Sequence, residues 1–320
     1  MVDTAAPNIL RLSSKQLTLA YGDTVALECG DLTASGTILA IIGHNGSGKS
    51  TLIKAILGLH SPRTGSLSVT RSCGNAAEHA LIPEKHMAFS PENGSVFEDI
   101  SVESYIKLWC RLKQRDGNYY LKEGSRFIDL FQIGPLLGRK GRELSKGQRR
   151  RVQTVVGYLT SPKLFLFDEP FDGLDVLQTK YLADIIKNES NEMCVVLSSH
   201  RMEVVERLAD SVIVLHDGKV FTSGNVENVC RTLCPSTYRF STNSLSDLPR
   251  LLQLCRNCFP ECRVGKYHEQ VSVSGRSVDP QRLVMACGEA QLDGIEFIEA
   301  PSSLPDAMSF HLSQNAQPAE

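Results

Sequence analysis

Short runs of consecutive apolar residues alternate with longer stretches of helical periodicity along the first two thirds of the chain. The run Ile38–Ile42 (ILAII) and the runs at 164–167 (LFLF) and 212–215 (VIVL) carry no polar side chain on either face. Such runs are typical of parallel strands that are buried on both faces of a sheet. Further strands are predicted at 9–12, 17–21, 25–28 and 194–198, and a helix is predicted at 50–57. The pattern therefore predicts an α/β fold.

A helical stretch interrupts this pattern. Residues 101–156 carry apolar side chains at helical spacing, as in VESYIKLWCRL and SRFIDLFQI, and predict a helical subdomain at about residues 95–155. The composition changes after Cys230, where a short polar segment contains Pro235. We therefore expect a first domain of residues 1–232 and a second domain of residues 233–320.

The second domain alternates strands and helices in a different order. Strands are predicted at 238–241, 262–268, 270–274 and 294–298, and helices at 246–258, 280–290 and 304–312. This order is βαββαβ followed by one helix. It predicts a C-terminal α+β domain of ferredoxin-like arrangement.

The composition narrows the class of protein. The chain has 320 residues, of which 42% are hydrophobic and 22% are charged, as in globular proteins, and its net charge of -2 gives no overall attraction to nucleic acid or anionic membranes. The longest clean apolar stretch, residues 36–43, is far shorter than the roughly 20 residues of a membrane-spanning helix. The opening residues lack the pattern of a signal peptide. We therefore expect a cytoplasmic protein whose ten cysteines are reduced.

One Gly-rich segment has the pattern of a phosphate-binding loop. Residues 43–51 (GHNGSGKST) match G-x-x-x-x-G-K-[ST], between a predicted strand and a predicted helix. The glycines allow successive N–H groups to surround phosphate oxygens, and the helix N-terminus favours the same anion. Lys49 adds a cation, and the Ser50 hydroxyl is placed to bind Mg²⁺. The candidate binding residues are Gly43, His44, Asn45, Gly46, Ser47, Gly48, Lys49, Ser50 and Thr51.

Further motifs follow in a fixed order. Residues 144–148 read LSKGQ, residues 163–170 read KLFLFDEP, residues 171–175 read FDGLD, and His200 follows the strand that ends in VVLSS. Together with the phosphate loop, they resemble the motifs of ABC-type ATPases over about residues 8–230. The resemblance implies a P-loop NTPase of ABC type with a helical subdomain, and it implies ATP and Mg²⁺ as cofactors.

The resemblance also assigns roles to residues. It implies that Tyr21 stacks on adenine and that Asp168 holds Mg²⁺. It implies that Glu169 orients or deprotonates the attacking water, while His200 senses the γ-phosphate. With Lys49, these two residues form the expected catalytic set.

The LSKGQ segment is expected to act on a second subunit. Ser145, Gly147 and Gln148 would present a hydroxyl and a helix N-terminus to ATP held by that subunit. The resemblance therefore implies a homodimer or heterodimer of ATP-binding subunits that encloses two ATP molecules.

Two residues depart from the family pattern. Lys146 replaces the first glycine of the LSGGQ signature, and Glu92 stands where the family usually has a glutamine directed at Mg²⁺. A glutamate at that position adds a negative charge beside the triphosphate. We expect ATP and Mg²⁺ to bind, while the effect of both departures on turnover stays open.

The resemblance implies transport as the function. We expect ATP hydrolysis to drive export through a separate transmembrane permease on the cytoplasmic face of the membrane, because residues 295–314 resemble the C-terminal extension of exporter ATP-binding subunits. The permease contact is expected at residues 92–112, which include Trp109. No nucleic-acid partner is expected.

Two other functions remain open at this point. One is a soluble ABC ATPase that acts on a ribosome or nucleic acid, for which the basic run at 139–151, with seven Lys or Arg, is the only local indication. The chain has a single cassette and no coiled-coil insertion, which disfavours this function. The other is a non-hydrolysing, ATP-gated binding module, which the presence of Glu169 and His200 disfavours.

The cysteines of the second domain allow two interpretations. Cys255, Cys258 and Cys262, with His268, have spacing found in zinc sites. Cys255 also continues an apolar helix face, and free cysteine is a common core residue. That face consists of Leu248, Leu251, Leu252, Cys255 and Phe259. The sequence favours the core interpretation.

Overall fold

The computed structural model describes residues 8–74, 76–122, 124–234, 236–275, 278–292, 294–300 and 302–315. Contacts divide the chain into two compact units, residues 1–224 and 225–320. The expected boundary between 232 and 233 falls instead after Gly224, because helix α8 (Val226–Leu233) packs against α11 (Leu304–Asn315) of the second unit. None of the helices in the described residues is long and apolar enough to cross a membrane.

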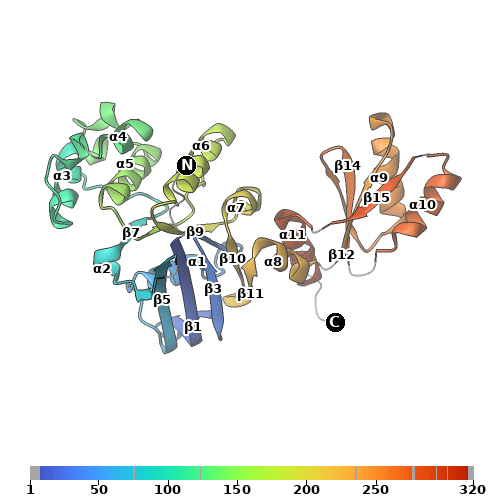
Figure 1. Ribbon diagram of the computed structural model, residues 1–320, viewed down its shortest axis with the longest axis horizontal. Coiled ribbons are helices and arrows are strands. Elements are labelled where there is room, and N and C mark those ends of the chain that lie inside the picture. Colours follow the sequence, from blue (N-terminus) through green and yellow to red (C-terminus); the bar gives the residue numbers. More distant parts are fainter. Residues whose placement is uncertain are drawn as a thin grey trace. The chain divides into compact units, whose positions relative to one another are not determined.

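The first unit is built on one large mixed sheet (Figure 1). Its strand order is β6-β5-β1-β2-β11-β10-β4-β9-β8-β7, and β3 pairs with β1. The strands are β1 (Asn8–Tyr21), β2 (Thr24–Glu28), β3 (Leu32–Gly36), β4 (Ile38–Ile42), β5 (Thr64–Cys73), β6 (His79–Ala80), β7 (Met87–Ser90), β8 (Leu164–Phe167), β9 (Cys194–Ser199), β10 (Ser211–His216) and β11 (Lys219–Asn225). The predicted α/β fold is confirmed.

Burial explains the two kinds of strand in this sheet. The neighbouring strands β7, β8, β9, β4 and β10 are parallel, and every residue of β4, β8 and β9 is buried. Strand β1 instead alternates buried and exposed residues and pairs antiparallel with β2, β3 and β5. It is one strand where two were predicted, with Gln16 at a positive φ inside it.

Seven helices of the first unit lie on this sheet or beside it. They are α1 (Lys49–Ile56), α2 (Pro83–His86), α3 (Val102–Leu112), α4 (Ser125–Leu130), α5 (Lys146–Leu159), α6 (Val176–Glu189) and α7 (Met202–Leu208). Figure 1 shows α3, α4 and α5 grouped together, and α5 contacts α3, α4 and β7. The region predicted to be helical is therefore occupied by these three helices and short connecting turns.

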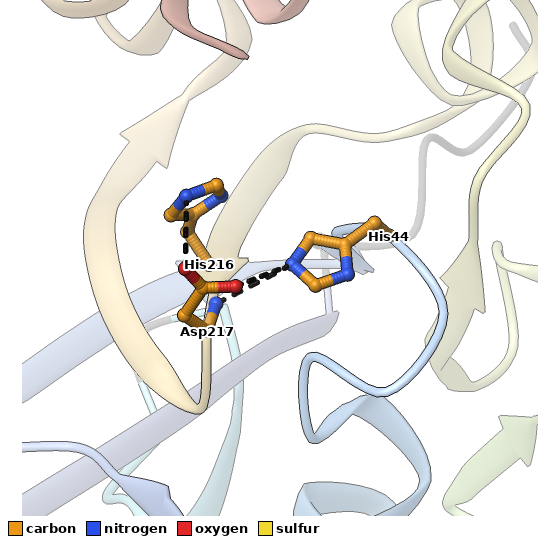
Figure 2. A group of neighbouring side chains, drawn as sticks. All are labelled: His44, His216 and Asp217. Atoms are coloured by element: carbon orange, nitrogen blue, oxygen red, sulfur yellow. Dashed lines mark hydrogen bonds and ion pairs between the residues drawn. The ribbon is translucent and has the colours of Figure 1, made fainter. Parts of the chain in front are cut away.

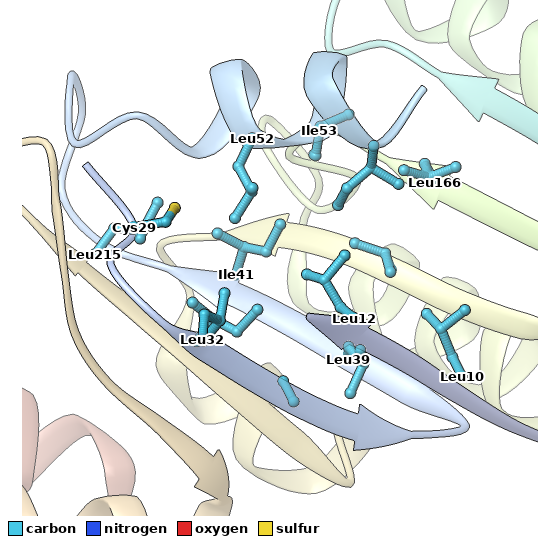
Figure 3. Close-up of a cluster of buried hydrophobic side chains, with 14 of the residues drawn as sticks. Leu10, Leu12, Cys29, Leu32, Leu39, Ile41, Leu52, Ile53, Leu166 and Leu215 are labelled. Atoms are coloured by element: carbon cyan, nitrogen blue, oxygen red, sulfur yellow. The ribbon is translucent and has the colours of Figure 1, made fainter. Parts of the chain in front are cut away.

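The core under α1 fixes the position of the phosphate loop. Leu52 and Ile53 of α1 point down onto the sheet, where Ile41 of β4 is buried (Figure 3). Each fully buried Leu or Ile side chain contributes about 1.5–3 kcal/mol. The loop between β4 and α1 is thus held at both ends by elements whose side chains are buried.

The second unit contains a four-stranded antiparallel sheet of order β13-β14-β12-β15. Along the chain, the elements after α8 are β12 (Ser236–Ser241), α9 (Leu248–Cys258), β13 (Arg263–Tyr267), β14 (Gln270–Gly275), α10 (Pro280–Glu289), β15 (Glu296–Glu299) and α11. Helix α9 packs on β13, β14 and α10. The unit is therefore α+β, with the order βαββαβ and a final helix.

The cysteine face of α9 belongs to the core of this unit. Cys255 is fully buried in a cluster with Leu251, Phe259 and Val273. Burial raises the pKa of the Cys255 thiol to about 12, so the thiol stays protonated at neutral pH. These observations agree with the core interpretation of Cys255.

Candidate active site

The loop after β4 makes a tight turn into α1. A Cβ on Gly43 would lie 2.4 Å from the carbonyl oxygen of Leu215, which excludes any side chain at this position. Gly48, immediately before α1, has a φ of 102°, which a glycine adopts without strain. The loop therefore packs directly against β10 and leads into the N-terminus of α1.

Lys49 links this loop to an acidic residue. Its side chain is only 6% exposed, and Nζ donates to the carbonyl oxygens of Gly43 (3.0 Å) and His44 (3.1 Å). Nζ also lies 3.1 Å from Oε1 of Glu169, whose side chain is 11% exposed. The ammonium group is therefore buried next to a carboxylate at the point where a triphosphate chain would enter.

Asp168 follows β8 and faces the start of α1. Its Oδ1 accepts hydrogen bonds from the Ser50 hydroxyl (3.2 Å) and from the Ser198 hydroxyl (2.6 Å). Ser198 also accepts from the Glu169 backbone N–H at 2.8 Å. Ser198 is fully buried in β9, so it holds both acidic residues in place. It was not identified from the sequence, although two serines at the end of a buried apolar run were a usable signal.

Glu169 is held by three further contacts. His200 Nδ1 lies 2.9 Å from Glu169 Oε2, and the His200 backbone N–H donates to the same oxygen at 3.3 Å. Glu169 has a φ of 48°, a left-handed conformation that costs free energy for a residue with a side chain. Its backbone carbonyl accepts a 2.7 Å hydrogen bond from Arg150 of α5.

Arg150 is a second residue that the sequence did not mark as functional. Its guanidinium is buried and also donates to the carbonyl oxygens of Asp172 (2.7 Å) and Pro170 (3.4 Å). Three carbonyl groups of one turn therefore converge on a single side chain. Arg150 connects α5, which begins in the LSKGQ segment, to the turn that carries Glu169.

Glu92 and Lys146, the two departures from the family pattern, lie next to each other. Lys146 Nζ is 3.6 Å from Glu92 Oε1, with both side chains substantially exposed. The loop that carries Glu92 packs tightly on α5, since a Cβ on Gly94 would lie 2.7 Å from the backbone nitrogen of Arg150. The structure therefore pairs the unusual glutamate with the unusual lysine.

The remaining residues of the LSKGQ segment line a different cavity. Ser145 and Gln148 form a capping box, in which each side chain accepts a hydrogen bond from the backbone N–H of the other. Ser145, Gly147 and Gln148 face a cavity of about 700 Å³ that also contains Leu177 and Tyr181. None of these residues lines the cavity at the phosphate loop.

Tyr21 lies outside the phosphate-loop cavity. Its ring lies next to the His60 ring at a tilt of 32°, with centroids 4.5 Å apart, and Lys54 Nζ lies 5.9 Å from the Tyr21 ring centroid. The Tyr21 side chain is about half exposed. The structure places it at the end of β1 without bringing it to the cavity wall.

The cavity at the phosphate loop has a volume of about 570 Å³. It is lined by Thr24, Val25, Ala26, Asn45, Gly46, Gly48, Lys49, Ser50, Thr51, Glu92, Glu169, Asp217 and Gly218. Within the described part of the chain, the fully buried Ser47 hydroxyl of the same loop has no hydrogen-bond partner. The hydroxyl and carboxylate oxygens of Ser50 and Asp168 are ligands that Mg²⁺ prefers. These residues therefore fit a magnesium–phosphate ligand.

Comparisons with known proteins agree with this arrangement. The family described as ABC transporter matches residues 32–172. An ABC transporter ATP-binding protein of Methanocaldococcus jannaschii is 30% identical over 230 residues, which cover 71% of this chain and 82% of that protein. The molybdenum import ATP-binding protein ModC of Mesorhizobium japonicum is 33% identical over 62% of this chain and 55% of its own length.

A solved structure extends the agreement to three dimensions. The structure of an ATP-binding subunit of an ABC transporter aligns with a TM-score of 0.60 and 31% identity, over 69% of this chain and 92% of that one. The phosphate loop, the paired acidic residues and this likeness lead to one conclusion. The chain belongs to the ABC transporter ATP-binding proteins, which bind ATP with Mg²⁺ and hydrolyse it.

Proposed function

We propose that this chain hydrolyses MgATP between two ATP-binding subunits and so drives export through a separate transmembrane permease. The observation that carries the hydrolytic part is that Lys49, Ser50 and Glu169 line one cavity, while Asp168 accepts a hydrogen bond from Ser50. The export direction is supported by residues 295–314, which resemble the C-terminal extension of exporter subunits. A relative is named as an import protein, so the direction needs its own test.

The binding roles follow from position and charge. Lys49 and the N–H groups of residues 43–51 hold the β- and γ-phosphates, and Ser50 with Asp168 holds Mg²⁺. Glu92 lines the same cavity and adds a third oxygen group near the metal. Bound Mg²⁺ would neutralise charge on the phosphates during the reaction.

We assign the catalytic roles to Glu169 and His200. Glu169 accepts a proton from the attacking water, and its backbone is held for this by Arg150 and Ser198. His200 contacts the same carboxylate, and this contact supports its role as the residue that senses the γ-phosphate. A triphosphate competes with Glu169 for Lys49, which frees the carboxylate for the water.

The dimer is supported by the separation of two cavities. Ser145, Gly147 and Gln148 line a cavity distinct from that of the phosphate loop, so they do not face ATP bound to their own chain. The N-terminus of α5 is suited to an anion. A second subunit, identical or related, would bring its ATP to this segment.

The permease contact is proposed at residues 92–112. This stretch exposes Phe97, Leu108 and Leu112, by 54%, 37% and 62%. Trp109 packs edge-to-face against Tyr105, so it supports the position of α3. With such a contact, the subunit would lie on the cytoplasmic face of the membrane.

A nucleic-acid partner is not supported by the basic run. Arg150 and Arg151 donate to backbone carbonyls, and Arg142 pairs with Asp99. Arg149 and Lys146 also make contacts within the chain. Most of these cations thus have a partner within the chain, either a backbone carbonyl or a surface carboxylate. The presence of Glu169 and His200 likewise argues against a non-hydrolysing module.

Transport assays test the proposal. The chain should copurify with the product of a neighbouring reading frame that encodes about six apolar segments of membrane-spanning length. In proteoliposomes with the chain outside, MgATP should drive the substrate into the lumen, away from the ATP-binding side. Movement of substrate toward the ATP-binding side would contradict export, and absence of any permease partner would contradict transport.

A further inference from the structure

Two histidines lie side by side because two neighbouring strands share a register. Strands β4 and β10 are parallel, with Val214 opposite Ile42. Two residues beyond that pair, the chain places His216 and His44, and their rings lie edge-to-face with centroids 5.4 Å apart. The backbone register, and not a flexible surface contact, therefore brings both imidazoles to the same end of the sheet.

A carboxylate lies between the two imidazoles. Asp217 Oδ1 is 3.1 Å from His44 Nε2, and Oδ2 is 3.4 Å from His216 Nε2 (Figure 2). Asp217 and Gly218 both have positive φ, 46° and 70°, which is the pattern of a type I′ hairpin turn between β10 and β11. The turn fixes the direction in which the Asp217 side chain leaves the backbone.

The hydrogen bonding of His44 defines the state of its ring. Nδ1 lies 2.8 Å from the carbonyl oxygen of Asn45, which can only accept, so Nδ1 carries the hydrogen. In the neutral ring, Nε2 then has a lone pair that faces a carboxylate oxygen at 3.1 Å. Either a proton on Nε2 or a metal ion between the two atoms satisfies both acceptors. The Asp217 N–H also approaches Nε2, but at 3.4 Å this contact is long and easily replaced.

The spacing fits a shared metal ion. Imidazole nitrogen and carboxylate oxygen both bind zinc at about 2.0–2.2 Å, so two ligands of a tetrahedral ion lie about 3.4 Å apart. In the described residues, these three side chains are the group whose ligand atoms lie close enough to share an ion, all within 4.8 Å of one another. Small rotations of the partly exposed side chains bring His216 to the same ion.

We propose that His44, His216 and Asp217 form a binding site for one divalent transition-metal ion, of which Zn²⁺ is the representative. Two imidazoles and one carboxylate suit zinc, nickel or copper, whereas Mg²⁺ prefers oxygen ligands. The site is therefore chemically different from the one at Ser50 and Asp168. Three protein ligands leave the remaining positions of the ion to water.

The site adjoins the phosphate-loop cavity. Asn45, Asp217 and Gly218 line that cavity, and His44 belongs to the loop itself. A bound ion ties the loop to the turn between β10 and β11. Metal binding and nucleotide binding are therefore expected to influence each other, although the metal site does not depend on the proposed export function.

Calorimetric titration of the nucleotide-free full-length chain with Zn²⁺ tests the site. His216→Ala should weaken binding at this site by at least about tenfold, the effect seen when even outer partners of metal ligands are removed. His79→Ala is the matched control, because it removes an exposed histidine of β6 and should leave binding unchanged. Unchanged affinity in His216→Ala would overturn the proposal.

Two further measurements show whether the metal binds at these three residues. Asp217→Asn has nearly the same shape and tolerates positive φ, so it should keep the fold while losing Zn²⁺-induced thermal stabilisation. The Co²⁺-loaded protein should show ligand-field bands that His216→Ala abolishes, without the charge-transfer band of thiolate ligands. Full stabilisation of Asp217→Asn by Zn²⁺, or a thiolate band that persists in His216→Ala, would place the metal elsewhere and overturn the assignment.

Discussion

Arg150 of helix α5 donates a 2.7 Å hydrogen bond to the backbone carbonyl of Glu169, the residue proposed as the general base. Glu169 has a left-handed φ of 48°, so its position depends on such external support. The same guanidinium holds two further carbonyl groups of the turn. These contacts join α5, which begins in the LSKGQ segment, to the turn that carries Glu169.

Replacing this arginine should affect stability and turnover together. In Arg150→Ala, three buried carbonyl groups lose their donor, and each unsatisfied group costs about 1–3 kcal/mol. We expect a lower unfolding temperature and a lower kcat for ATP, with Arg142→Ala as the exposed control. Thermal unfolding and steady-state hydrolysis measure both effects. Full kcat in a folded Arg150→Ala protein would show that the Glu169 position does not depend on this contact.

Lys49→Ala should weaken ATP binding. The substitution removes a buried cation that would meet the phosphates, and hydrogen bonds to charged groups contribute about 1.5–3 kcal/mol, or about 10–150-fold in affinity. Equilibrium titration with a fluorescent ATP analogue gives the affinity, and Lys85→Ala is a matched exposed control. If Lys49→Ala binds the analogue as tightly as the unchanged protein, Lys49 does not contact the phosphates.

The pair formed by Glu92 and Lys146 should contribute little to stability. Both side chains are about half exposed, and ion pairs of this kind contribute about 0–1 kcal/mol. A double-mutant cycle with Glu92→Gln and Lys146→Gly should give a coupling free energy below about 1 kcal/mol. Glu92→Gln should nevertheless raise the Mg²⁺ concentration needed for half-maximal hydrolysis, because it removes a negative charge from the cavity. An unchanged Mg²⁺ requirement would place Glu92 outside the metal site.

The two units should separate at Gly224. A chain that ends there should fold and bind ATP, because few contacts cross a boundary between compact units. A chain that ends at Leu233 should be less soluble, since it exposes the face of α8 that contains Val229 and Cys230. Thermal unfolding of both shortened chains, with and without MgATP, shows whether each one folds and binds ATP. An aggregated product from the shorter chain would show that the second unit is needed for the first to fold.

The sequence predicted those parts of the molecule that depend on local pattern. The buried strand Ile38–Ile42 and the loop after it were evident, because all-apolar runs and the spacing of glycines are readable without long-range contacts. Strand β5 was missed, since its sequence TGSLSVTRSC is polar and lies in the antiparallel part of the sheet. Strand β7 was missed because MAFS contains a small alanine and a polar serine, whereas β8, of the same length, is an all-apolar run of large residues.

The parts of the site that the sequence did not reveal arise from contacts across the fold. Ser198 and Arg150 act through hydrogen bonds to the acidic turn from β9 and α5. Their roles depend on how β9 and α5 pack near β8, and no local sequence motif predicts that packing. The adenine-stacking role implied for Tyr21 stays a prediction, since its ring lies next to His60 and is not among the residues that line the phosphate-loop cavity. The domain boundary moved for a similar reason, since α8 packs on α11.

The steady-state rate of ATP hydrolysis by Glu169→Gln at saturating MgATP tests the central claim most directly. The amide has nearly the same shape as the carboxylate but cannot accept the proton of the attacking water. We predict a fall of about 10²–10⁴-fold in this rate, with ATP still bound and a dimer retained on size-exclusion chromatography. A rate equal to that of the unchanged protein would show that the general base is a residue other than Glu169.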